Sequence, residues 1–326
     1  MNRNLGKSNL KISPIALGTF AIGGTMWGGN EEKDSIEAIH ASIDNGVTSI
    51  DTAPFYGLGL SETVIGKALK GKDRSKVQLL TKFGLVWDGS NQGKGDYFFD
   101  VSHNGSALPV YKFASKQNVI KEVEESLKRL HTDYIDLLQL HWPDVTTPIN
   151  ETMEAIELLK QQGKIKAAGV SNYNIAQLQE AEQTTLLASN QVAYSMLNRK
   201  IEQELVPFTT AQNIGIIAYS PMERGLLTGK YLADKILKQD DHRNGYFKQH
   251  DSEKVKSFLE KITTIAESKN ISLSQLVLGW TIQQQGITSA LAGARNAAQA
   301  ESNAKALEVV FQPEELVFIN TTLATL

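Results

Sequence analysis

One pattern recurs eight times along this chain of 326 residues: a short apolar run followed by a segment with helical spacing. The apolar runs lie at residues 15–20, 48–53, 77–84, 135–142, 165–172, 189–195, 214–221 and 288–295. Several are apolar over four to six consecutive residues, which is typical of strands buried on both faces of a parallel sheet. Between the first two runs, Ile36, Ile39 and Ile43 share one helical face, and Gly46 ends the helix. The repetition therefore predicts eight parallel βα units.

The spacing of the runs distinguishes between two α/β folds. It lengthens after the third and seventh runs, and each long segment follows the C-terminal end of a strand, where a (β/α)8 barrel carries its catalytic loops. A doubly wound sheet with a second domain would instead place a G-x-G-x-x-G turn after the first strand, and residues 20–30, FAIGGTMWGGN, do not match that pattern. We therefore predict a single-domain (β/α)8 TIM barrel over residues 1–326, with extended loops after strands 3 and 7.

Charge and composition exclude several partners and chemistries. The net charge of −3 offers no basic surface for nucleic acid or for an anionic membrane. No apolar run approaches the roughly 18 residues of a membrane helix, and the first residues lack the apolar core of a signal peptide. The chain has no cysteine, and its six histidines show none of the spacings of a zinc site. We expect a cytoplasmic, monomeric protein without a metal.

The stretch DTAPFYGLGLSE, residues 51–62, admits two interpretations. Its G-L-G could cradle the phosphates of a dinucleotide, or the stretch could be a catalytic turn that carries Asp51 and Tyr56. The first interpretation lacks a third glycine, and the stretch follows the second strand rather than the first. The second gains support from Lys82 and His141, which also end apolar runs. Strand ends converge on one mouth of a barrel, so we predict a shared site.

Each of the four residues alone could be structural: a turn aspartate, a packed tyrosine, a solvated lysine and a half-buried histidine. Together they suggest acid–base chemistry, because a lysine that ends a buried strand needs an anion and Asp51 lies on the neighbouring strand. An ammonium beside Tyr56 would lower the pKa of the phenol from its usual value of about 10 and make it a proton donor. His141 would orient the substrate oxygen. This set suits protonation of a carbonyl oxygen as hydride reaches its carbon, whereas acyl transfer would need a serine or cysteine paired with a base.

Taken with their flanking residues, these motifs resemble those of the aldo-keto reductases. DTAPFYG (51–57), TK (81–82) and LQLHWP (138–143) carry the Asp, Tyr, Lys and His of that family's catalytic tetrad. The likeness extends over about residues 5–310, and AIGGTMWGG and EKDSIE are similar to a bacterial subgroup close to the general-stress and inositol-locus reductases of Gram-positive bacteria. The resemblance implies NADPH-dependent reduction of a small aldehyde or ketone, with Tyr56 as general acid. NADH is the less favoured cofactor.

The resemblance also implies where the cofactor lies. Ser171, Asn172 and Gln191 would hold the nicotinamide carboxamide. Tyr219 would stack on the nicotinamide ring. RGLLTGK (224–230) would cover the pyrophosphate, and AGARNAAQAESN (292–303) would bind the adenosine 2′-phosphate. The contacts implied in these two segments are Arg224, Leu226, Lys230, Gly293, Arg295, Gln299 and Asn303.

Arg295 is the main candidate for contact with the 2′-phosphate. It ends the last strand directly before a helix, and a helix N-terminus with an arginine suits a phosphate at this place in a barrel. Many eukaryotic members have a Lys-Ser pair and an arginine where this chain has Gly293-Ala294 and Gln299, so the contact depends mainly on Arg295. The alternative is that Arg295 caps a surface helix. Arg243, in the second long loop, is a further candidate for the same phosphate patch.

Aromatic residues near the strand ends would wall the substrate pocket, although each could equally belong to the core. They are Phe20, Trp27, Phe55, Trp87 and Trp142. Such a pocket suits aldehydes or ketones of modest polarity. Two other functions stay open from the residues. The barrel could bind nucleotide as a redox-sensing regulatory module with slow turnover, or Lys82 could form a Schiff base in a lyase or epimerase.

Overall fold

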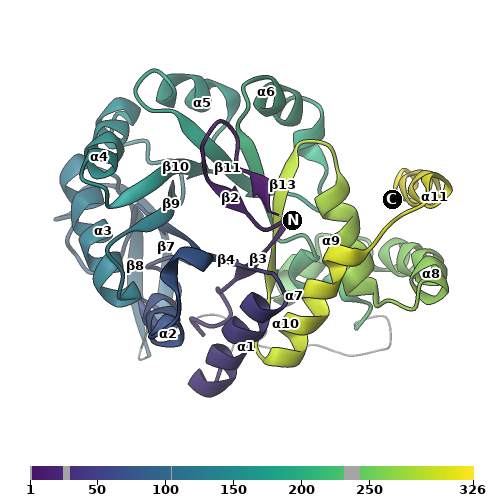
Figure 1. Cartoon of the computed structure of the whole chain (residues 1–326). Coiled ribbons are helices and arrows are strands. Elements are labelled where there is room, and N and C mark those ends of the chain that lie inside the picture. Colours follow the sequence, from purple (N-terminus) through teal and green to yellow (C-terminus); the bar gives the residue numbers. More distant parts are fainter. Residues whose placement is uncertain (1, 25–29, 104, 231–242) are drawn as a thin grey trace.

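A computed structural model describes residues 2–24, 30–103, 105–230 and 243–326. Its centre is a closed barrel of eight strands in the order β3-β4-β5-β9-β10-β11-β12-β13 and back to β3 (Figure 1). The strands are β3 Ile15–Gly18, β4 Ser49–Asp51, β5 Gln78–Phe83, β9 Ile135–Leu140, β10 Ile165–Ser171, β11 Leu187–Ala193, β12 Gly215–Tyr219 and β13 Ile287–Gly293. Every barrel pairing is parallel. The predicted (β/α)8 barrel is therefore confirmed, and the doubly wound alternative is wrong.

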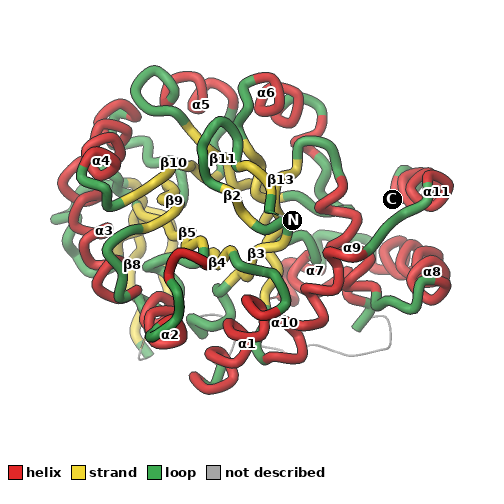
Figure 2. Tube along the Cα trace, in the orientation of Figure 1, coloured by secondary structure: helices red, strands yellow, loops and turns green. Residues whose placement is uncertain are grey.

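Helices surround the barrel in a ring (Figures 1 and 2). Those that follow barrel strands are α1 Glu32–Asp44, α2 Leu60–Leu69, α3 Lys116–Leu130, α4 Ile149–Gln161, α5 Ile175–Ala181, α6 Leu205–Ala211, α9 Leu273–Gln283 and α10 Ala297–Ala304. The others are α7 Arg243–Phe247, α8 Ser252–Ser268 and α11 Pro313–Leu323, and α8 packs against α11. α9 begins with a capping box formed by Ser272 and Gln275. Among the helices that are described, none combines the length and apolarity needed to cross a membrane.

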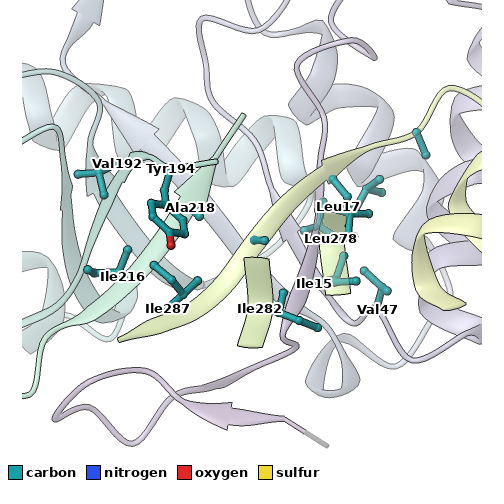
Figure 3. Packing of buried hydrophobic residues seen from close by; sticks show 14 of the residues in the cluster. Ile15, Leu17, Val47, Val192, Tyr194, Ile216, Ala218, Leu278, Ile282 and Ile287 are labelled. Atoms are coloured by element: carbon teal, nitrogen blue, oxygen red, sulfur yellow. The ribbon is translucent and has the colours of Figure 1, made fainter. Parts of the chain in front are cut away.

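Strand side chains alternate between the barrel interior and the helices, which creates two apolar layers. The interior layer includes Leu80, Leu137 and Ile217, all fully buried. The outer layer lies between strands and helices, and Figure 3 shows part of it around Ile216 and Ile287. Complete burial of each such side chain contributes about 1.5–3 kcal/mol. The two layers therefore make the barrel a rigid frame for residues at its strand ends.

A short N-terminal hairpin plugs the barrel at the N-terminal ends of its strands. It consists of β1 Arg3–Asn4 and β2 Lys11–Ile12, which pair antiparallel. Leu5 and Ile12 are fully buried in the interior layer. The Arg3 guanidinium donates to the carbonyl oxygen of Ile282 at 2.7 Å. The hairpin thus fastens this end of the barrel, opposite the ends that carry Asp51 and Lys82.

The long segment after β5 contains a small antiparallel sheet where the sequence predicts a loop. Its strands are β6 Leu85–Val86, β7 Asp96–His103 and β8 Ser106–Lys112, in the order β6-β8-β7. The glycine, asparagine and serine residues of this segment suggest irregular structure, but Gly105 takes a φ of +79° and lets the chain reverse tightly. The long segment after β12 begins with the 3-10 turn Glu223–Thr228 and leads into α7 and α8. Both predicted extensions are present, and the first is more regular than predicted.

The glycines of DTAPFYGLGLSE form the turn between β4 and α2. Gly57 and Gly59 take φ values of +66° and +99°, which residues with a side chain rarely adopt. A Cβ at Gly57 would lie 2.1 Å from the carbonyl oxygen of Gly23, so two backbone segments are in direct contact here. The turn places Tyr56 beside the end of β4 before the helix starts at Leu60.

Candidate active site

The Lys82 ammonium lies at the centre of a buried hydrogen-bonded cluster. Its Nζ is 2.6 Å from Asp51 Oδ1, 2.9 Å from the carbonyl oxygen of Thr52 and 3.1 Å from Tyr56 Oη. An ammonium has three protons to donate, and these three acceptors use all of them. Lys82 and Asp51 are each 1% exposed. The ion pair and the carbonyl therefore fix the direction of the third N–H, which points at the phenol.

The register of the parallel strands brings these groups together. Asp51 is the last residue of β4, and its Cα partner in β5 is Leu80, two residues before Lys82. Lys82 is paired in turn with Gln139 of β9, two residues before His141. Residues two apart point to the same face of a strand. The strand ends thus gather the predicted aspartate, lysine and histidine on one side of the barrel mouth, together with Tyr56.

Burial raises the pKa of the Tyr56 phenol above its ordinary value, and the Asp51 carboxylate adds to the rise. Lys82 acts in the opposite direction but does not outweigh burial. The predicted lowering of this pKa is therefore wrong in its net direction, because it counts the ammonium and leaves out the desolvation of the phenolate. Burial lowers the pKa of Lys82, but Asp51 and Tyr56 outweigh it and the net shift is upward. At neutral pH the pair is a protonated phenol beside an ammonium.

His141 lies against the Tyr56 ring, with ring centroids 5.7 Å apart and ring planes at 78°. Its backbone N–H donates to the carbonyl oxygen of Phe83 at 2.9 Å, which anchors it to β5. Burial and the charge of Lys82 hold the pKa of its imidazole well below the ordinary value. The ring is therefore neutral at pH 7 and can donate one N–H to an oxygen placed beside the phenol.

Two amides hold the second carboxylate oxygen of Asp51. Oδ2 accepts from Gln191 Nε2 at 2.8 Å and from Gln139 Nε2 at 3.2 Å. The sequence predicts Gln191 as a cofactor contact, and the structure directs its amide nitrogen at this carboxylate. Gln139 is a residue that sequence reasoning missed. Its signal was a polar side chain two residues before His141, in a strand that is apolar at every other position after Asp136.

Ser171, Asn172 and Tyr219 lie together beside this cluster. Tyr219 Oη donates to Asn172 Oδ1 at 3.0 Å, and Asn172 Nδ2 donates to Ser171 Oγ at 3.1 Å. Ser171 Oγ donates to the carbonyl oxygen of Gln191 at 2.8 Å, which ties β10 to β11. Asn172 takes a φ of +62°, a region that few non-glycine residues adopt. Strained backbone of this kind is concentrated at binding sites, and here it accompanies three polar side chains.

The segment after β12 holds the residues predicted at the pyrophosphate. Arg224 is exposed, takes a φ of +54° and places its guanidinium 4.1 Å from the centre of the Tyr246 ring. The Tyr246 hydroxyl donates to the buried carboxylate of Glu223, so the turn after β12 is tied to α7. The other predicted residues of this part of the chain are the partly buried Leu226, the exposed Lys230 and Arg243 at the start of α7.

The residues predicted at the 2′-phosphate lie in one turn between β13 and α10. Asn303 Nδ2 donates to the carbonyl oxygen of Gly293 at 3.0 Å, and the Arg295 backbone N–H donates to Gln299 Oε1 at 3.0 Å. Asn30 Nδ2 donates to the carbonyl oxygen of Arg295 at 2.8 Å, so a distant part of the sequence also shapes the turn. Gln299 and Asn303 thus hold the backbone of the turn that presents Arg295.

Aromatic rings predicted for the pocket lie beside Tyr56. The Phe20 ring is 4.9 Å from the Tyr56 ring. Phe55 is 4% exposed and packs edge-on against Trp87 at 5.9 Å. Trp27 lies outside the described residues. Phe55 therefore packs in the wall of the pocket. Phe20 and Trp87 are more exposed than Phe55.

The hairpin of β7 and β8 supplies two further rings that sequence reasoning missed. Phe98 lies 5.2 Å from Trp142, and Phe99 contacts Phe55 edge-on at 5.7 Å. Their signal was the pair of phenylalanines in the first long segment, but a predicted loop gave no reason to direct them at the mouth. The rings of the hairpin and of the barrel loops form one cluster together with Tyr56.

Residues 14–322 match the model of the aldo/keto reductase family. The chain belongs to the aldo/keto reductase family. It is 38% identical over 325 residues to the aldo-keto reductase YhdN of Bacillus subtilis (strain 168), and the match covers 98% of this chain and 92% of that relative. It is 35% identical over 310 residues to the NADH-specific methylglyoxal reductase of Escherichia coli (strain K12), with 94% and 93% covered.

Solved structures of aldo/keto reductases share the barrel. The glycerol dehydrogenase AKR11B4 from Gluconobacter oxydans matches with a TM-score of 0.87 and 34% identity, over 99% of this chain and 95% of that one. An aldo-keto reductase from Klebsiella pneumoniae in complex with NADPH matches with a TM-score of 0.71 and 29% identity, over 95% and 91%. The predicted membership in a bacterial group of aldo/keto reductases is confirmed. In the described part of this aldo/keto reductase, no group of three or more His, Asp or Glu is arranged to hold a metal ion.

Proposed function

We propose that this aldo/keto reductase reduces aldehydes and ketones of modest polarity to alcohols with NADPH, and that Tyr56 is the general acid. The observation that carries the proposal is the 3.1 Å hydrogen bond from the Lys82 ammonium to Tyr56 Oη. Asp51 and the Thr52 carbonyl hold the same ammonium, so its direction is fixed. A phenol that gives up a proton becomes a phenolate, and a fixed cation at this distance stabilises that charge.

The side chains around the substrate oxygen then have separate roles. NADPH supplies hydride to the carbonyl carbon. The neutral His141 imidazole donates a hydrogen bond to the carbonyl oxygen and orients it beside Tyr56. The Tyr56 hydroxyl, which stays protonated because its pKa is raised, passes its proton to that oxygen, and Lys82 stabilises the phenolate. A Schiff base at Lys82 would need a neutral amine, and the raised pKa of Lys82 argues against that alternative.

The groups beside the cluster fit the nicotinamide end of NADPH. A carboxamide needs both donors and acceptors, and Ser171, Asn172 and Gln191 offer hydroxyl and amide groups of both kinds. Tyr219 lies next to them, held by its hydrogen bond to Asn172, so its ring is available to stack on the nicotinamide. The proposed contacts to the rest of the cofactor are Arg224, Leu226, Lys230, Arg243, Gly293, Arg295, Gln299 and Asn303.

Preference for NADPH over NADH is part of the proposal and depends on Arg295. Support comes from its position in the turn before α10 and from the Klebsiella pneumoniae relative, whose structure contains NADPH. The Escherichia coli relative is named for NADH, which makes NADH the alternative cofactor. From the sequence we also propose that the chain acts as a cytoplasmic monomer of one domain.

A panel of carbonyl substrates and alcohols, assayed in parallel with NADPH and NADH, tests this function. We expect loss of the reduced nicotinamide absorbance with an aromatic aldehyde and NADPH. Tyr56→Phe should abolish turnover and retain NADPH binding, measured by fluorescence quenching, because the ring stays and only the proton donor is removed. Normal turnover in Tyr56→Phe would show that Tyr56 is not the acid. Tight NADPH binding with very slow turnover on every substrate would favour the redox-sensing alternative.

A further inference from the structure

The Gln139 side chain forms hydrogen bonds to two residues of the candidate site, Asp51 and Gln191. Its Nε2 donates to Asp51 Oδ2 at 3.2 Å, and its Oε1 accepts from Gln191 Nε2 at 3.2 Å. The residue is fully buried, and its Cα partner in the neighbouring strand β5 is Lys82 itself. Gln139 therefore lies beneath the reacting groups and contacts them only through Asp51 and Gln191.

The hydrogen bonds of Asp51 divide between its two oxygens. Oδ1 accepts from Lys82, and Oδ2 accepts from the two amides of Gln139 and Gln191. A carboxylate can rotate about its Cβ–Cγ bond, and donors on both oxygens fix that rotation. The fixed Oδ1 then sets the position of the Lys82 ammonium, whose remaining proton is directed at Tyr56.

The barrel leaves room for Gln139 by means of a glycine. Gly169 of β10 is the Cα partner of Gln139 in the neighbouring strand. A Cβ at Gly169 would lie 3.0 Å from Gln139 Cγ and 2.6 Å from Ser189 Oγ, so any side chain there would press on both. The absence of a Cβ at Gly169 thus has a local reason: it makes space for the amide that holds Asp51.

We propose that Gln139 is a positioning residue that links the nicotinamide-amide site to the proton donor. It shares one hydrogen bond with Gln191, at the cofactor side, and one with Asp51, which holds Lys82 toward Tyr56. The inference rests on the proposed function, because it assigns Gln191 to the cofactor and Tyr56 to the proton. Gln139 touches neither substrate nor cofactor, and its effect passes through the residues it holds.

Two substitutions separate the hydrogen bonds from the space that the side chain fills. Gln139→Met keeps nearly the same volume and removes both hydrogen bonds. Gln139→Glu keeps the shape but can donate to Asp51 only when the new carboxyl is protonated. Ser189→Ala is the matched control, because Ser189 is equally buried in the interior and its hydroxyl has no hydrogen-bond partner among the described residues.

The first readout is turnover as a function of pH, with the rate of each variant divided by that of the wild type. Gln139→Met should lower kcat by about tenfold or more at every pH, since a hydrogen bond to a charged group is lost, and should change the KM for the aldehyde little. Gln139→Glu should recover toward the wild-type rate as pH falls, because burial and the Asp51 charge raise the pKa of the introduced carboxyl and its protonated form can donate. The titratable groups nearest to this position are Asp51, Lys82, Tyr56 and His141.

The second readout does not depend on turnover. Gln139→Met should weaken NADPH binding severalfold, because the amide nitrogen of Gln191 loses one of its two acceptors, Gln139 Oε1, and keeps only Asp51 Oδ2. It should leave unchanged the binding of an adenosine bisphosphate that carries the 2′-phosphate but no nicotinamide. Both affinities are measured by titration, with melting temperatures as a check on folding. Wild-type kcat, pH profile and NADPH affinity in both Gln139 variants would overturn the positioning role. A wild-type enzyme that binds NADPH but reduces no carbonyl would instead overturn the proposed function, while the affinity comparison still tests Gln139.

Discussion

Replacing Lys82 by methionine removes the cation beside Tyr56 and keeps most of the side-chain length. At the 3.1 Å separation of Lys82 Nζ and Tyr56 Oη, the attraction between a phenolate and an ammonium is about 5 kcal/mol at an effective dielectric constant of about 20. A hydrogen bond to a charged group is worth about 1.5–3 kcal/mol net. The loss of transition-state stabilisation should lie between these two energies. We expect kcat to fall by about a hundred- to a thousandfold.

The same substitution has a separate effect on stability. Lys82→Met leaves the buried Asp51, 1% exposed, without a cation beside it, and removing one partner of a buried ion pair costs about 3–5 kcal/mol. The double variant Asp51→Asn/Lys82→Met should regain part of that stability without regaining turnover. Lys166→Met is the matched control, because Lys166 forms an ion pair with Asp136 at 3.0 Å, away from the candidate site, and is 52% exposed.

The assay is steady-state reduction of an aromatic aldehyde at saturating NADPH, with NADPH affinity from fluorescence quenching and the melting temperature from calorimetry. Loss of turnover in Lys82→Met with retained NADPH binding is the expected result, and Lys166→Met should match the wild type in both. A folded Lys82→Met enzyme that turns over at nearly the wild-type rate would refute the reasoning, because Tyr56 would then need no cation to give up its proton.

Three further outcomes are expected. Burial and Lys82 hold the pKa of His141 well below its ordinary value. As the pH drops, the imidazole therefore takes up a proton in the unfolded state first, and the melting temperature should fall below about pH 6.5. His141→Gln should show a smaller fall in melting temperature. Burial raises the pKa of Glu122, which accepts from the Gly84 N–H at 3.1 Å, to about 8, so the unfolded state releases this proton first and stability should fall as pH rises from about 5 to 8. At pH 8 the free energy of unfolding of Glu122→Gln, measured with urea, should exceed that of the wild type by on the order of 3 kcal/mol. Equal free energies would contradict this expectation. Arg295→Ala should weaken NADPH binding about tenfold or more and leave NADH binding nearly unchanged in titrations; equal losses for both would exclude a 2′-phosphate contact.

The barrel could be predicted from the sequence because its strands are buried on both faces. Such strands appear as continuous apolar runs, and each of the eight predicted runs overlaps one barrel strand. The hairpin of β7 and β8 could not be predicted in this way. Many of its residues are partly or fully exposed, so Asp96–His103 has no apolar run to mark it, and its pairing depends on a turn at Gly105.

The residues that end strands could also be brought together from the sequence, because parallel strands in a barrel share one mouth. Asp51, Lys82 and His141 were found in this way. Gln139 was not, since its role depends on contacts across the interior that appear only when the barrel is closed. The net direction of the Tyr56 pKa was missed for a related reason: a neighbouring charge can be inferred from sequence, but the degree of desolvation depends on the complete packing.

The N-terminal hairpin has a consequence for how the chain folds. β3 pairs with β13, and Arg3 binds Ile282, which lies 279 residues further along the chain. Gly6 is so close to Ala188 that a Cβ would lie 2.5 Å from its carbonyl oxygen. β1 and β2 can pair with each other early, but during synthesis Arg3 remains without its partner Ile282 until that residue has left the ribosome. Contacts of such long sequence separation form slowly, so we expect a late step of folding to join the start of the chain to much later residues, at the end of the barrel opposite the candidate site.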